Sequence, residues 1–100
     1  MARFDVYRLE GFRHYVVDVQ ADILRDLSTR VVVPLVALDE QKSETSPRLR
    51  PLLTISGTDY VLNTPELAAV PSSRLAERVK NLDHQHETIV DALDFLMQGF

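Results

Sequence analysis

Three histidines are the side chains of this chain best suited to acid–base or metal chemistry. His84 and His86 are two positions apart, so on a helix they would point in different directions and form a poor pair of metal ligands. His14 is far from both in the sequence. We therefore predict that His84 and His86 are surface residues beside the start of a helix, and we predict no metal site.

Two further sets of residues could carry chemistry. Asp18 and Asp22 form a possible carboxylate pair, but no nearby histidine or glycine loop completes a site, so we interpret both as structural hydrogen-bond acceptors. Arg30, Thr54 and a histidine could in principle supply the base, the acid and the cation of a metal-free ribonuclease. The spacing of these residues does not require such a site.

The motifs that the chain lacks favour a binding protein. The chain has no cysteine, which excludes a disulfide framework, a thiolate metal site and a cysteine nucleophile. The sequence also lacks a glycine-rich phosphate loop, zinc-ligand spacing and a nucleophile elbow. The residues alone therefore favour a module that binds over one that catalyses, and they imply no cofactor.

Length and composition indicate one soluble domain. The chain has 100 residues, 45% of them hydrophobic and 26% charged, which is typical of a single globular domain spanning residues 1–100. The amino-terminal residues lack the apolar run of a signal peptide, and no stretch approaches membrane-spanning length. We expect a cytoplasmic protein with no membrane partner.

The charge balance is acidic. Fifteen acidic and 11 basic residues give a formal net charge of −4, which repels nucleic acid unless a local basic face exists. Arg25 with Arg30, and Arg48 with Arg50, are the candidates for such a face, and both pairs lie in or beside predicted loops. Because scattered surface arginines are the simpler interpretation, we expect no direct binding of nucleic acid.

The hydrophobic pattern predicts about five strands. Alternation and β-branched content place them at residues 3–7, 15–20, 30–38, 52–55 and 60–62. Pro34 cannot donate to a β-ladder, so the third strand should carry a bulge, a bend or an edge there. Residues 56–59 indicate a hairpin connection, residues 22–29 a loop or one helical turn, and residues 39–50 an exposed polar connection.

Helical features follow the strands. Thr64 as N-cap and Pro65 at the first helical position predict a short helical turn that Pro71 ends. Residues 72–82 are ambiguous, and we interpret them as a short helical or irregular approach to the final helix. Strands followed by one long helix indicate an α+β domain, in which the helix covers one face of a strongly bent antiparallel sheet. The number of strands favours a small barrel.

The final helix, residues 83–100, is the longest amphipathic element. Asp83 is its predicted N-cap, and Gly99 is the residue that can turn left-handed after the last helical turn. Two interpretations of its end stay open: a frayed terminus whose Phe100 folds back onto the sheet, or a tail of Gln98, Gly99 and Phe100 presented to a partner. The apolar stripe of this helix consists of Ile89, Leu93, Leu96 and Phe100.

Five segments together resemble the CcdB family of plasmid-borne toxins, the toxic component of a toxin–antitoxin pair. They occur in the family order and spacing across nearly the whole chain, so the resemblance rests on the set and not on one motif. The segments are Phe4-Asp5-Val6-Tyr7, residues 17–23, residues 30–35, Ala69-Val70-Pro71 and the closing helix at residues 83–100.

The resemblance implies a fold and a mechanism. The implied fold is a homodimer of SH3-like small antiparallel β-barrels, each ending in a long C-terminal helix, which is the fold shared with the MazF and Kid ribonuclease toxins. The implied mechanism is non-catalytic: the toxin binds the A subunit of DNA gyrase and traps the gyrase–DNA cleavage complex. An antitoxin of the CcdA type, with a disordered tail, neutralises it.

The resemblance also implies the target-binding residues. In the family these are the last three, Trp-Gly-Ile in the best-known member, and here the same positions are Gln98, Gly99 and Phe100. Glutamine therefore replaces a large aromatic anchor. Two alternatives stay open: a ribonuclease toxin of the MazF/Kid type on the same fold, and a family member that binds its antitoxin but no longer poisons gyrase because of Gln98.

The expected antitoxin contact is the exposed polar connection in the middle of the chain. The acidic charge balance of the chain suits a partner tail that carries basic and apolar residues. The candidate residues are Glu40, Lys42, Ser43, Glu44 and Pro47.

Overall fold

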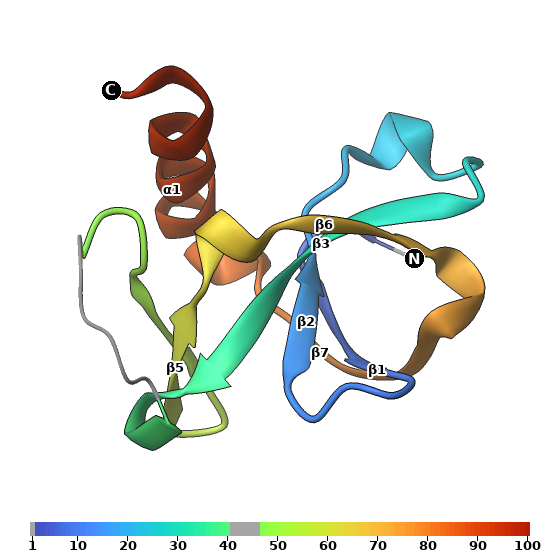
Figure 1. Ribbon diagram of the computed structural model, residues 1–100, viewed down its shortest axis with the longest axis horizontal. Helices are drawn as coiled ribbons and strands as arrows, with labels where there is room; N and C mark the ends of the chain where they lie inside the picture. Colours follow the sequence, from blue (N-terminus) through green and yellow to red (C-terminus); the bar gives the residue numbers. More distant parts are fainter. Residues whose placement is uncertain (1, 41–46) are drawn as a thin grey trace.

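The computed structural model describes residues 2–40 and 47–100, which form a strongly curled antiparallel sheet with one α-helix at the carboxyl end (Figure 1). The helix, α1, spans His86–Gln98. The strands are β1 (Asp5–Leu9), β2 (Tyr15–Asp18), β3 (Thr29–Ala37), β4 (Leu52–Ile55), β5 (Thr58–Leu62), β6 (Ala68–Pro71) and β7 (Leu75–Asn81). Short 3-10 turns connect them: η1 (Asp22–Leu24), η2 (Leu38–Glu40), η3 (Thr64–Glu66), η4 (Ser72–Arg74) and η5 (Asp83–Gln85).

Strand β3 organises the sheet. The hydrogen-bonded order is β4-β5-β3-β2-β1-β7, and β6 also pairs with β3. On one side of β3, residues 29–32 pair with β6 and residues 35–37 pair with β5, so the strand changes partner in its middle. The sheet therefore curls into a half-barrel, and the predicted α+β class with a small barrel is confirmed.

Pro34 lies where β3 changes partner. It pairs with Val16 of β2, and its carbonyl oxygen accepts a 2.9 Å hydrogen bond from the backbone N–H of Asn63 just beyond β5. Since the nitrogen and carbonyl of one strand residue point to the same side, the missing N–H faces the gap between the β6 and β5 ladders. The predicted irregularity at Pro34 is thus confirmed as a switch of partner strands.

The hairpin between β4 and β5 is tighter than predicted. Strand β5 begins at Thr58, so only Ser56 and Gly57 connect the two strands. Both residues have positive φ, 51° and 83°, as a type I′ turn requires. The second residue is a glycine, which adopts this conformation without strain.

Two strands were missed in the sequence. Residues 68–71 form β6 and residues 75–81 form β7, where a continuing helical turn and a helical or irregular approach were predicted. Leu75 and Val79 are four residues apart, a spacing that fits both a helix and one face of a strand. Strand β7 also bulges twice against β1, which interrupts the alternation that would have identified it.

Both predicted N-caps are wrong. The η3 turn has Asn63 at its N-cap, and the buried Thr64 hydroxyl lies 3.5 Å from the carbonyl of Leu62, while Pro65 does occupy the first turn. The α-helix begins at His86 and not at Asp83, because Asp83 opens the 3-10 turn η5. Gly99 ends the helix as predicted, with φ of 81° and its N–H bonded to the carbonyl of Phe95 at 2.9 Å.

The core fills the concave side of the curled sheet, and α1 covers part of it. From the helix, only Ile89 and Ala92 are fully buried, and both lie in its first half. Within the described residues, no helix is long and apolar enough to cross a membrane. The main core cluster consists of Phe4, Val6, Val17, Val19, Val33, Leu35, Leu53, Ile55, Leu62, Leu82, Ile89 and Ala92.

Candidate functional site

The carboxyl-terminal tail stands free of the sheet. Phe100 is 75% exposed and Met97 is 64% exposed, so the aromatic ring does not fold back onto the core. Figure 1 shows the terminus at the far end of α1, pointing away from the strands. Gln98 and Gly99 are also exposed. Of the two interpretations of the chain end, the structure agrees with an exposed tail.

Arg48 fastens the middle of α1 to the domain. Its Nε and Nη2 each lie 3.0 Å from a carboxylate oxygen of Asp91, which is a bidentate ion pair, and its guanidinium lies 4.7 Å from the ring centroid of Phe95. Arg50 donates from Nε to Oδ1 of Asn63 at 3.0 Å. The two arginines therefore hold structural elements together and do not form a shared basic face.

Arg30 is fully buried and paired with Asp18. Neither side chain is exposed, and Arg30 Nε and Nη2 lie 2.8 and 2.5 Å from Oδ2 of Asp18. Oδ1 of Asp18 accepts the backbone N–H of Gln20 at 3.0 Å. Burial raises the pKa of Asp18, opposed by the hydrogen bonds from Arg30 and Gln20. The interpretation of Arg30 as a scattered surface arginine beside a loop is wrong, because β3 carries it into the core.

A second buried carboxylate joins β1 to β7. Asp5 Oδ1 accepts hydrogen bonds from Arg78 Nε and Asn81 Nδ2, both at 2.9 Å. Burial acts to raise the pKa of Asp5, but the hydrogen bonds from Asn81, Ala2 and Arg78 hold this pKa below its ordinary value. This carboxylate is therefore ionised and structural.

The residues proposed for a ribonuclease site do not come together. Arg30 is enclosed with Asp18, whereas Thr54 is exposed on β4, where its hydroxyl donates to Asp59 at 2.9 Å. His84, within η5, and His86, the first residue of α1, are exposed as predicted, and His86 Nδ1 lies 2.7 Å from the carbonyl oxygen of Asp83. This set therefore gives no support to RNA cleavage.

The prediction that Asp18 and Asp22 are structural hydrogen-bond acceptors is confirmed. Asp18 accepts from Arg30 and Gln20, and Asp22 accepts the backbone N–H of Arg3 at 2.8 Å. In the part of the chain that the structure describes, no group of three or more histidine and carboxylate side chains is arranged to hold a metal ion.

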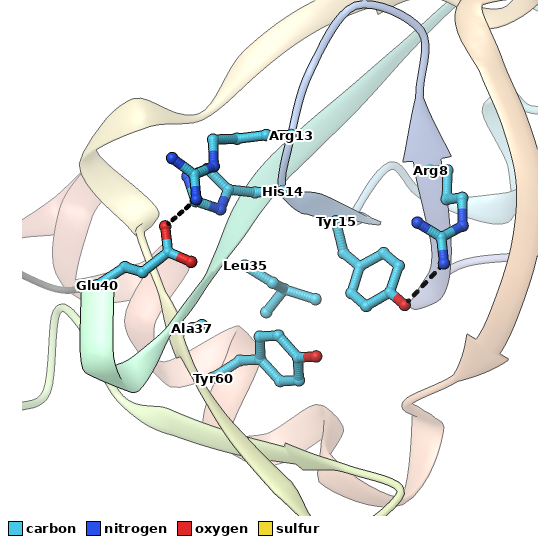
Figure 2. Close-up of a pocket in the computed structure, with 8 residues that line it drawn as sticks. All are labelled: Arg8, Arg13, His14, Tyr15, Leu35, Ala37, Glu40 and Tyr60. Carbon is cyan, nitrogen blue, oxygen red and sulfur yellow. Dashed lines mark hydrogen bonds and ion pairs between the residues drawn. The ribbon is translucent and has the colours of Figure 1, made fainter.

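A pocket of about 230 Å³ opens where the core meets solvent, and sequence reasoning missed it (Figure 2). The sheet register builds it: Arg8 is opposite Tyr15, Tyr15 is opposite Leu35, and Tyr60 is opposite Ala37. Residues opposite one another in a ladder share a face, so these side chains converge. The lining residues are Arg8, Arg13, His14, Tyr15, Leu35, Ala37, Glu40 and Tyr60.

Charged groups surround an aromatic and apolar interior in this pocket. Arg13 Nη2 lies 2.8 Å from Oε1 of Glu40, and Arg8 donates to the hydroxyl of Tyr15 at 3.3 Å. The rings of Tyr15 and Tyr60 have centroids 5.8 Å apart. The adjacent residues 13–15 were a visible signal in the sequence, but their partners come from strands that only the fold brings close.

The candidate antitoxin residues are partly described. Glu40 ends η2 and pairs with Arg13, and Pro47 is exposed. Lys42, Ser43 and Glu44 lie outside the described residues.

Comparison with known proteins agrees with this architecture. Among solved structures, the fold is similar to that of an endoribonuclease in complex with its cognate antitoxin from Mycobacterial species. The TM-score is 0.75 at 18% sequence identity, over 97% of this chain and 94% of that chain. Residues 3–99 match the family described as CcdB protein. The chain therefore belongs to the CcdB family of toxins from toxin–antitoxin systems.

Proposed function

We propose that this toxin binds the A subunit of DNA gyrase and traps the gyrase–DNA cleavage complex through Gln98, Gly99 and Phe100. The observation that carries the proposal is the exposed tail: Phe100 is 75% exposed and follows a left-handed Gly99 at the end of a family-matched chain. An exposed aromatic residue is the kind of side chain that anchors protein interfaces. A target that works on intracellular DNA places the toxin in the cytoplasm.

Gln98 is the feature that sets the strength of this binding. Replacing a buried tryptophan anchor by a flexible polar group costs on the order of 2–4 kcal/mol at an interface. In this proposal Phe100 supplies the aromatic anchor in its place. The variant Gln98→Trp should then tighten gyrase binding by on the order of 30- to 1,000-fold.

A DNA cleavage assay with purified gyrase, ATP and supercoiled plasmid tests the proposal. The wild-type protein should produce trapped double-strand breaks, and deletion of Phe100 should abolish them. Phe12→Ala is the matched control, because it removes another exposed aromatic ring at a distant turn and should leave the breaks unchanged. Breaks that persist after the Phe100 deletion would refute the role of the tail.

Absence of breaks with the wild-type protein would favour the alternative within the family. In that case the chain binds its antitoxin but has lost gyrase poisoning because position 98 is glutamine. Breaks that appear only with Gln98→Trp would identify that substitution as the cause.

We also propose that the toxin is a homodimer. Ile23 is 87% exposed, Leu24 and Leu27 are about half exposed, and these three apolar side chains lie on and just after η1. Apolar side chains gathered on one short exposed segment suit an interface. Light scattering should give twice the mass of the 11.4 kDa chain. Ile23→Asp should shift the protein toward monomer, whereas Glu66→Gln, at an exposed position on η3, should not.

The proposed antitoxin is of the CcdA type and binds beside η2. Glu40 ends η2 and Pro47 is exposed, and a net charge of −4 favours a partner tail with basic residues. The Glu40→Lys variant should weaken antitoxin binding and should leave gyrase poisoning intact, since Glu40 is on a different element from the tail.

RNA cleavage is the second candidate function. Its support is the similarity in fold to a chain named an endoribonuclease. Incubation of the purified protein with single-stranded RNA should leave the RNA intact if the gyrase proposal is correct. Specific cleavage that co-purifies with the folded protein would favour the ribonuclease instead.

A further inference from the structure

The pocket in Figure 2 is separate from the tail. None of the eight side chains that line it comes from α1 or from residues 98–100. Two half-buried aromatic rings, Tyr15 and Tyr60, line its interior beside the half-buried Ala37, while Leu35 is fully buried and offers no exposed surface. Such an interior favours a planar ring as ligand.

The rim of the pocket is basic although the chain is acidic. Arg8, Arg13 and His14 lie on it, against the single carboxylate of Glu40. Arg13 is well exposed and uses Nη2 toward Glu40, so a guanidinium with five N–H donors still has donors to offer a ligand. Arg8 approaches Glu77 through Nε at 3.3 Å and Tyr15 through Nη2. An anionic group would therefore meet oriented cationic donors.

We propose that this pocket binds a nucleoside monophosphate group. The base lies against Tyr60 and Tyr15, and the phosphate is held by Arg13 and His14. Glu40 can accept a hydrogen bond from an amino group of the base. The volume of about 230 Å³ is enough for the base, and the phosphate lies at the rim. Aromatic rings beside arginine are the combination that recognises unstacked nucleotides.

The same chemistry could come from a free mononucleotide or from one residue of a single strand. Titration of ¹⁵N-labelled full-length protein, followed by NMR, tests both. One arm uses each of the four ribonucleoside 5′-monophosphates, and the other uses a short oligouridine. Saturable shifts confined to the pocket residues are expected in at least one arm. A larger response to the oligonucleotide assigns a single strand as the source, and an equal response assigns the free nucleotide.

Variants connect the response to the proposed contacts. Arg13→Ala, at an exposed position that should not disturb folding, should weaken binding at least fivefold, and Tyr60→Ala should do the same. Tyr60→Phe keeps the ring and should bind as wild type. Arg25→Ala is the matched control, because Arg25 is an exposed arginine just after η1 and outside the pocket, and it should leave binding unchanged.

Three results would overturn the proposal. The first is the absence of saturable shifts at the pocket in both arms. The second is an equal response to inorganic phosphate alone, which would reduce the site to a simple anion contact. The third is a pocket that responds only to an acidic peptide used as a comparison ligand.

Discussion

Breaking the buried ion pair between Asp18 and Arg30 should strongly destabilise the fold. The variant Asp18→Asn is nearly isosteric, and its amide oxygen can still accept the N–H of Gln20. Its NH2 group then takes the place of Oδ2, so the variant removes both the negative charge and the acceptor that faces Arg30. Arg30 then remains charged and fully enclosed. Removing one partner of a buried pair costs about 3–5 kcal/mol, a large part of the roughly 5–15 kcal/mol that stabilises a domain.

Urea denaturation followed by circular dichroism measures this effect. With a slope of about 2 kcal/mol per molar urea, the midpoint should fall by about 1.5–2.5 M. The exposed Asp26→Asn is the matched control and should shift the midpoint little. The double variant Asp18→Leu with Arg30→Met should recover most of the loss, because it leaves no buried charge without a partner.

The result that would refute this reasoning is an Asp18→Asn midpoint equal to that of the wild type. Such a result would mean that water or another group reaches the guanidinium. Nη1 of Arg30 is the atom to examine, since it has no hydrogen-bond partner among the described residues.

Three further predictions concern the helix and the second buried carboxylate. Arg48→Ala removes an exposed bidentate ion pair with Asp91, so the free energy of unfolding should fall by less than about 1 kcal/mol. Amide hydrogen exchange at residues 93–99, measured by mass spectrometry, should become faster. Gly99→Ala should lower the free energy of unfolding by about 1 kcal/mol, as measured by thermal denaturation. The added Cβ would meet no atom within 4 Å, so the cost comes from holding alanine at a φ of 81°. The depressed pKa of Asp5 means that its stabilising contribution is complete above the unfolded value near 3.8 and is lost as pH falls through the lower folded pKa. In Asp5→Asn, the free energy of unfolding should therefore fall less steeply below about pH 4 than in the wild type. An unchanged dependence of this free energy on acidic pH would contradict the prediction.

Much of the fold could be predicted because its signals are local. Alternating apolar residues identified β1 to β5, and Gly99 identified the end of the helix. Strands β6 and β7 were missed because their pattern is weak: both are largely exposed, and they are strands because they pair with β3 and β1, far away in the sequence. Pairing with distant strands decides the secondary structure of such segments.

The candidate sites show the same difference between local signals and contacts made by residues far apart in the sequence. The exposed tail could be proposed from a terminal aromatic residue after glycine, and the structure places it in solvent. The buried partner of Arg30 could not be predicted from the sequence. Asp18 is 12 residues away and reaches Arg30 only across the ladder between β2 and β3. The pocket likewise depends on register, which aligns Arg8, Tyr15 and Leu35 from three strands.

Direct binding to the gyrase A subunit is the measurement that tests the central claim most directly. Isothermal titration calorimetry measures the affinity of the wild-type protein and of the Phe100 deletion for the A subunit. Both proteins are first verified as folded, so the comparison isolates the contribution of one exposed residue. The proposed function predicts measurable binding by the wild type that falls at least tenfold with the deletion. Equal affinity of the two proteins for the A subunit would contradict a target-binding role for the tail.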